Sequence, residues 1–280
     1  MGKAIAGTVW EVSLGKFDAA KAKLLNQLGE RGAEVFERLN EDPDYCYRVA
    51  KAMVYGLQDW RPRLSADEIG TKFGRAVTIL GQDFISPMDI FLGMGMTYGT
   101  DQVAMLAEMM PTEEVLKWLA ANEYMLVAGP PTAMSLLDIR AKKSELFYSK
   151  TDDAWYCQQE QKFVRDDKVG EGWLALRKTV VPRSANKTWE EQQKLLFAEE
   201  RVPNAAEVAW GVITYKAVRN EFLLPLIYAR TSSVSADGRR VSVGDFAAAG
   251  LHVAGYWGDL HSADLGLAGA RLPAGKAGKF

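Results

Sequence analysis

The stretch RVSVGDFAAAGLHVAGYWGDLHSADLGLAGAR, from Arg240 to Arg271, is the most informative part of this 280-residue sequence. Short apolar runs separated by turn residues predict three strands in it, over residues 240–246, 251–257 and 265–272. A further strand is predicted just upstream, over 222–230, and Ala236-Asp-Gly238 is a typical turn between the two regions. The carboxyl end is therefore predicted to form a set of short antiparallel strands.

Two kinds of residue are interleaved in this stretch. Apolar residues form a frame that we expect to pack inside: Val243, Phe246, Leu251, Val253, Trp257, Leu265 and Leu267. Between them lie small and amphipathic residues, which are typical of adaptable recognition surfaces. Residues 222–273 also contain no Lys, Glu, Gln or Met, and the low preference of strands for helix-forming residues explains this only in part. The pattern predicts a fixed scaffold that carries interchangeable side chains.

The sequence before these strands predicts further helices and strands. Strands are predicted over 125–131 and 173–177, and a short helix over 135–145. Thr188-Trp-Glu-Glu191 is a capping box that predicts a helix to about residue 197, and Asn204 is a typical cap for another. Helices followed by short antiparallel strands indicate an α+β fold.

Residues 1–124 are predicted to form a separate helical domain. Apolar residues recur at helical spacing over 17–39 and 44–57, and the capping box Ser65-Ala-Asp-Glu68 predicts a helix to about residue 80. Residues 81–100 contain Pro87 and several glycines and are expected to be irregular, with helices over 101–110 and 112–124. At the other end, residues 274–280 are expected to be a flexible tail.

Charge and composition exclude several classes of protein. With 34 basic and 36 acidic side chains, the net charge of −2 argues against nucleic-acid binding through bulk charge. The sequence contains no apolar run of about 18 residues, which predicts no membrane span. No secretory signal is visible at the start, so a cytoplasmic location is expected by default. The two histidines, His252 and His261, and the two cysteines, Cys46 and Cys157, offer little for catalysis, which favours a binding protein.

An ordered set of segments carries a family resemblance. The segments are Gly172-Trp-Leu-Ala-Leu-Arg177, Asn186-Lys-Thr-Trp-Glu-Glu-Gln192, Arg201-Val-Pro-Asn-Ala-Ala-Glu207, Ala229-Arg-Thr-Ser-Ser233 and the 240–271 stretch. Together they resemble the variable proteins of diversity-generating retroelements in phages, bacteria and archaea. The resemblance implies a C-terminal ligand-binding domain of C-type lectin fold over residues 125–273, with its variable region over about 240–271.

The resemblance also implies which residues vary. In that family, reverse transcription misreads adenines of the template, which randomises the first two positions of codons that begin with two adenines. When the third base of such a codon is a pyrimidine, the randomised codon cannot encode Lys, Glu, Gln, Met or Trp. The implied variable positions are Ser242, Asp245, Ala247, His252, Ala254, Gly255, Tyr256, Gly258, Leu260, His261, Ala263 and Asp264. Their side chains are expected on an exposed face that binds a protein or cell-surface ligand, without a cofactor and with homo-oligomerisation possible. Tyr256, His252 and His261 are the expected anchors.

The sequence also leaves three alternative functions open. C-type lectin-like folds also occur in formylglycine-generating enzymes, so an enzyme of that type, or one that depends on Cys157, is the leading alternative. A calcium-dependent lectin would need converging carboxylates, for which Asp237, Asp245, Asp259 and Asp264 are candidates. A structural or phage-assembly protein would use the C-terminal strands only as a contact surface.

Overall fold

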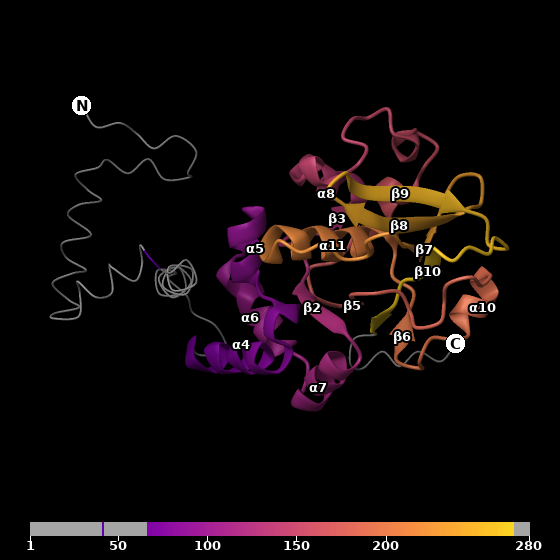
Figure 1. Cartoon of the computed structure of the whole chain (residues 1–280). Coiled ribbons are helices and arrows are strands. Elements are labelled where there is room, and N and C mark those ends of the chain that lie inside the picture. The colour runs from indigo at the N-terminus through magenta and orange to yellow at the C-terminus, as the bar shows by residue number, and fades with distance from the viewer. Residues whose placement is uncertain (1–40, 42–65, 272–280) are drawn as a thin grey trace, which may run out of the picture. The chain divides into compact units, whose positions relative to one another are not determined.

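The structure, a computed structural model, describes Glu41 and residues 66–271. The helices predicted over 17–39 and 44–57, the tail predicted over 274–280 and Cys46 lie outside the described residues. The chain divides into two units, Met1–Asp59 and Trp60–Phe280. The described residues from 66 onward belong to the second unit, which is an α+β structure (Figure 1).

Helices form the first part of this unit, as the sequence predicts. They are α4 (Ala66–Leu80), α5 (Pro87–Met94), α6 (Thr100–Glu108) and α7 (Glu113–Ala121). The expectation of an irregular segment over 81–100 is wrong over residues 81–94, where η2 (Gly81–Asp83) and β1 (Phe84–Ile85) lead into α5. Proline is tolerated in a first helical turn, and Ser86 and Asp89 close a capping box around Pro87, so this proline starts a helix.

A five-stranded sheet has the strand order β1-β2-β5-β11-β6. Its other members are β2 (Tyr124–Ala128), β5 (Trp173–Arg177), β6 (Glu200–Arg201) and β11 (Ala270–Arg271). The strands predicted near 125 and over 173–177 are thereby confirmed. Each residue of β2 is buried, as expected of a strand covered on both faces. Because Phe84 of β1 pairs with Leu126 of β2, the domain boundary expected after residue 124 lies inside one packed core.

A four-stranded sheet has the strand order β10-β7-β8-β9. These strands are β7 (Tyr228–Val234), β8 (Arg240–Ala247), β9 (Gly250–Tyr256) and β10 (Leu265–Leu267). The predicted antiparallel arrangement is confirmed for β7, β8 and β9. It is wrong for the last predicted strand: residues 265–267 run parallel to β7, and Ala270–Arg271 crosses into the five-stranded sheet.

Helix α11 (Ala205–Arg219) lies between the two sheets and contacts β5 on one side and β7 and β8 on the other (Figure 1). The predicted cap is confirmed, since Asn204 and Glu207 form a capping box. Gly211 lets α11 pack closely on the five-stranded sheet: a Cβ there would lie 2.5 Å from Leu176 Cδ2 and 2.6 Å from Met125 Cε, so these side-chain ends would have to move. The α11 helix therefore joins both sheets into one core and supports the four-stranded sheet from beneath.

Short elements complete the unit. They are β3 (Met134–Ser135), α8 (Leu136–Lys142), η3 (Ser144–Leu146), η4 (Trp155–Cys157), α9 (Phe163–Asp166), β4 (Lys168–Val169) and α10 (Trp189–Gln193). The predicted helix near 135–145 is confirmed as α8, and the Thr188 capping box is confirmed at the start of α10, which ends earlier than predicted. Within residues 66–271 no helix is both long and apolar enough to span a membrane.

Candidate binding face

The twelve predicted variable positions lie on β8, on β9 and in the loop that follows them. Four are exposed: Leu260, His261, Ala263 and Asp264. Seven are half-buried: Asp245, Ala247, His252, Ala254, Gly255, Tyr256 and Gly258. Ser242 is fully buried.

Strand β9 separates the frame from the surface by simple alternation. Leu251 and Val253 are buried, whereas His252, Ala254 and Tyr256 are half-exposed on the opposite side. Successive side chains of a strand point to opposite faces, so these three residues define one surface of the four-stranded sheet, called here the outer face. The helix α11 packs beneath the sheet, contacting β7 and β8, which leaves the outer face of β9 accessible.

The prediction that Ser242 is exposed is wrong. Strand β8 lies between β7 and β9, and Ser242 pairs with Ala254 on one side and with Arg230 on the other. Arg230 is itself fully buried, so the serine has a buried neighbour on its own face of the sheet. The Ser242 hydroxyl is buried and has no hydrogen-bond partner.

The prediction that Trp257 packs inside is also wrong. Its side chain is 56% exposed, while Val243, Phe246, Leu251, Val253, Leu265 and Leu267 of the predicted frame are buried. Strand β9 ends at Tyr256, so the inside–outside alternation no longer applies to the next residue. Trp257 instead belongs to the exposed surface.

Aromatic rings form a continuous row on the outer face. His252 stacks on Tyr148, with ring centroids 4.0 Å apart, and meets Tyr228 edge-on at 6.4 Å. Tyr228 in turn meets Tyr256 edge-on at 5.5 Å. Tyr148 and Tyr228 are not among the site residues that the sequence predicts. Tyr228 lies two positions before Arg230 in a predicted strand, which offers a weak signal, whereas nothing near Tyr148 in sequence indicates its place.

Acidic side chains adjoin two of these tyrosines. Burial raises the pKa of Tyr228 to about 12, and Tyr256 and the Asp245 carboxylate add to the effect. Burial likewise raises the pKa of Tyr256, with the charge of Asp264 second. Both phenols therefore stay protonated at neutral pH.

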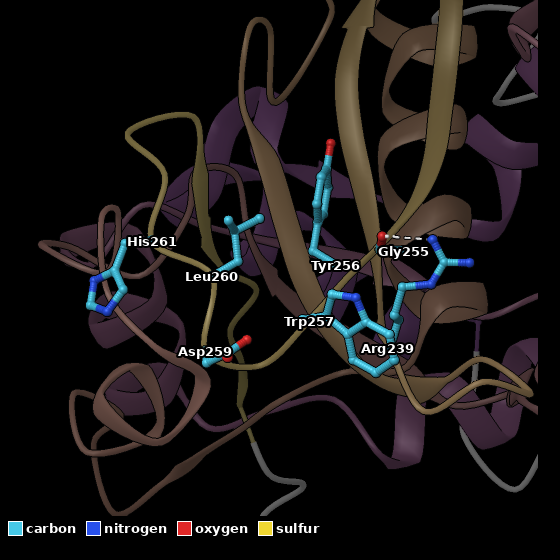
Figure 2. A pocket seen from close by; sticks show the side chains of 7 residues that line it. All are labelled: Arg239, Gly255, Tyr256, Trp257, Asp259, Leu260 and His261. Atoms are coloured by element: carbon cyan, nitrogen blue, oxygen red, sulfur yellow. Dashed lines mark hydrogen bonds between the residues drawn. The ribbon is translucent and has the colours of Figure 1, made fainter.

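A shallow pocket of about 360 Å³ opens beside the aromatic row (Figure 2). It is lined by Arg239, Gly255, Tyr256, Trp257, Asp259, Leu260 and His261, six of which follow β8. Arg239 pairs with Asp237 at 2.7 Å and donates to the Gly255 carbonyl at 3.4 Å (Figure 2). The pocket thus combines aromatic and aliphatic surface with a few polar groups, the usual composition of a binding site.

The structure also shows the surroundings of the residues on which the alternative functions depend. The Cys157 thiol accepts a hydrogen bond from Arg140 Nη1 at 2.9 Å, yet burial raises its pKa more than Arg140 lowers it. Reactive thiols have a lowered pKa. Of the calcium candidates, Asp237 is held by Arg239 and Ser235, which lower its pKa to about 2. Among the described residues, no group of three or more His, Cys, Asp or Glu could hold a metal ion.

Comparison with family models, with curated proteins and with solved structures gives no match to this chain.

Proposed function

We propose that this chain is a non-catalytic, receptor-like binding protein whose outer face and adjoining loop carry interchangeable residues. In this proposal the domain has a C-type lectin-like fold, and retroelement mutagenesis diversifies its surface to bind varied protein or cell-surface targets. The observation that carries the proposal is the alternation along β9, where His252, Ala254 and Tyr256 face outward and Leu251 and Val253 are buried.

The elements around the face support the fold assignment. The two helices predicted from their caps, α10 and α11, precede the antiparallel strands β7, β8 and β9. Six of the seven predicted frame residues are buried. Substitutions on such a surface typically change stability by no more than about 0.5 kcal/mol, because the scaffold beneath does not depend on them. A fixed core under a tolerant surface is what diversification needs.

The aromatic row supports a protein or cell-surface target. Several variable positions are Ala or Gly and offer little contact area, but Tyr148, Tyr228 and Tyr256 supply large amphipathic rings. Tyr and Trp are enriched where proteins bind one another, since they bury much area and still make hydrogen bonds. Exposed Trp257 extends this surface into the pocket.

A pair of matched libraries tests the proposal. One library randomises the outward residues His252, Ala254 and Tyr256, and the other randomises the buried residues Val243, Leu251 and Val253. Both are displayed as full chains and scored for protease resistance. We expect most members of the first library to stay folded and most of the second to unfold, because removing a buried leucine side chain costs about 2–5 kcal/mol.

The first library is then selected against a purified protein that the parent chain does not bind. Recovery of folded binders is the expected result. Equal loss of folding in the two libraries, or folded members without any binder, would contradict the proposal. For diversification itself, the nearby DNA should contain a near-copy of the final coding segment that differs at adenines, beside a reverse-transcriptase gene. A locus without them would remove that part of the proposal.

A further inference from the structure

Arg230 is a buried cation whose role the binding proposal does not explain. It lies on β7 and is fully buried, although arginine is almost never fully buried without a partner. Its guanidinium donates to four neutral oxygens, which come from two segments distant in sequence. An arginine buried in this way fixes whatever main chain supplies its acceptors, because each donor that loses its acceptor is left unsatisfied.

Two of the acceptors belong to the wall of the pocket. Arg230 Nη2 donates to the carbonyl oxygens of Trp257 and Leu260, each at 2.8 Å. Arg230 Nη1 donates to the Lys187 carbonyl at 2.9 Å and to Gln192 Oε1 at 3.1 Å. One planar guanidinium therefore holds the pocket loop against the segment that includes the start of α10, and its fixed fork suits several acceptors at once.

Main-chain hydrogen bonds complete the attachment of the loop. The Trp189 amide donates to the Gly258 carbonyl at 2.8 Å, and the Asn186 amide donates to the Ser262 carbonyl at 2.8 Å. The side chains of Asp259 and Leu260 are exposed and line the pocket. The loop is thus held mainly through its carbonyl oxygens, which every amino acid carries.

We infer that Arg230 is a positioning residue that fixes the main chain of the 257–262 loop, so that exchange of the Leu260 side chain, a predicted variable position, changes what the pocket recognises without changing its shape. The consequence for recognition rests on the proposed function, whereas the attachment of the loop by Arg230 does not. Arg230 lies outside the predicted variable positions, as a fixed support must.

Hydrogen exchange of the full-length chain, read amide by amide by NMR, tests the inference without any ligand. The reporters are the Trp189 and Asn186 amides, which donate to the loop. In Arg230→Gln we expect both to exchange at least about tenfold faster, as loss of a charge-assisted hydrogen bond would produce in a local opening equilibrium. Amides of β2 and β5 should keep their wild-type rates. The matched control is Arg239→Gln, which removes an arginine from the same pocket and should leave both reporters unchanged.

The variant Leu260→Ser changes a side chain of the loop and leaves its main-chain carbonyls in place. We expect wild-type exchange at both reporter amides, because the carbonyls remain. If Arg230→Gln does not fold, Arg230→Lys replaces it: a single ammonium cannot hold the two segments together, so the reporters should again exchange faster.

Unchanged reporters in the Arg230 variants would overturn the inference. So would an equal acceleration in β2 and β5, which would mean that Arg230 only stabilises the whole fold, or faster exchange in Leu260→Ser. A failure of the binding proposal appears instead as libraries without binders, while these exchange rates stay as expected.

Discussion

Replacing Gly250 by alanine should displace the segment that carries Tyr148 from the binding face. Gly250 begins β9 and has φ +109°, a conformation that residues with a side chain rarely adopt. A Cβ at this position would lie 2.5 Å from the carbonyl carbon of Phe147 and 2.6 Å from the amide nitrogen of Tyr148. Both atoms belong to main chain, so the clash cannot be relieved by rotating a side chain.

The magnitude follows from what the alanine would break. The strained backbone costs about 1–3 kcal/mol. Moving residues 147 and 148 also breaks the 3.1 Å hydrogen bond from the Tyr148 amide to the Leu251 carbonyl, which contributes about 1 kcal/mol. Phe147, now fully buried, would lose part of its packing as well. We therefore expect Gly250→Ala to lower the free energy of unfolding by about 2–4 kcal/mol.

Urea unfolding followed by tryptophan fluorescence measures this change in the full-length chain. The control is Gly170→Ala, where an added Cβ has no neighbour within 4 Å and a change under about 0.5 kcal/mol is expected. NMR of the His252 ring reports in parallel whether Tyr148, now 4.0 Å away, still stacks on it. A Gly250→Ala chain as stable as the control, with the His252 signals unmoved, would refute the reasoning.

Two further predictions concern buried charge and the thiol. Glu200→Ala should lower the free energy of unfolding by about 3–5 kcal/mol, because it leaves buried Arg177, now 2.7 Å from Glu200, without its carboxylate. Adding Arg177→Met should recover part of that loss in the same urea experiment, and a single variant within about 1 kcal/mol of wild type would contradict the expectation. Burial raises the pKa of Cys157, so in a Cys46→Ser chain this thiol should react with iodoacetamide at pH 8 more slowly than the free amino acid cysteine does. A faster reaction, or copper binding that protects the thiol, would favour the Cys157-dependent enzyme instead.

Local features of the sequence were enough to predict much of the C-terminal half. The capping boxes at Thr188 and Asn204 do mark helix starts, because the cap and its partner lie within four residues of each other. The alternation of Leu251, His252 and Val253 likewise predicts which side chains are buried, since the period of a strand is set by its own backbone. Composition indicated a tolerant surface, and of the twelve predicted positions four are exposed, seven are half-buried and one is buried.

Tertiary structure decided the features that depend on neighbours far along the chain. Ser242 is buried beside Arg230, its partner on β7, whose guanidinium binds the carbonyls of the 257–262 loop, and nothing in its own segment specifies that pairing. Trp257 is exposed because β9 ends one residue earlier. Tyr148 reaches His252 only because residues 147–148 run beside the start of β9, and a contact of this kind comes from the packing of whole elements, which local sequence does not encode.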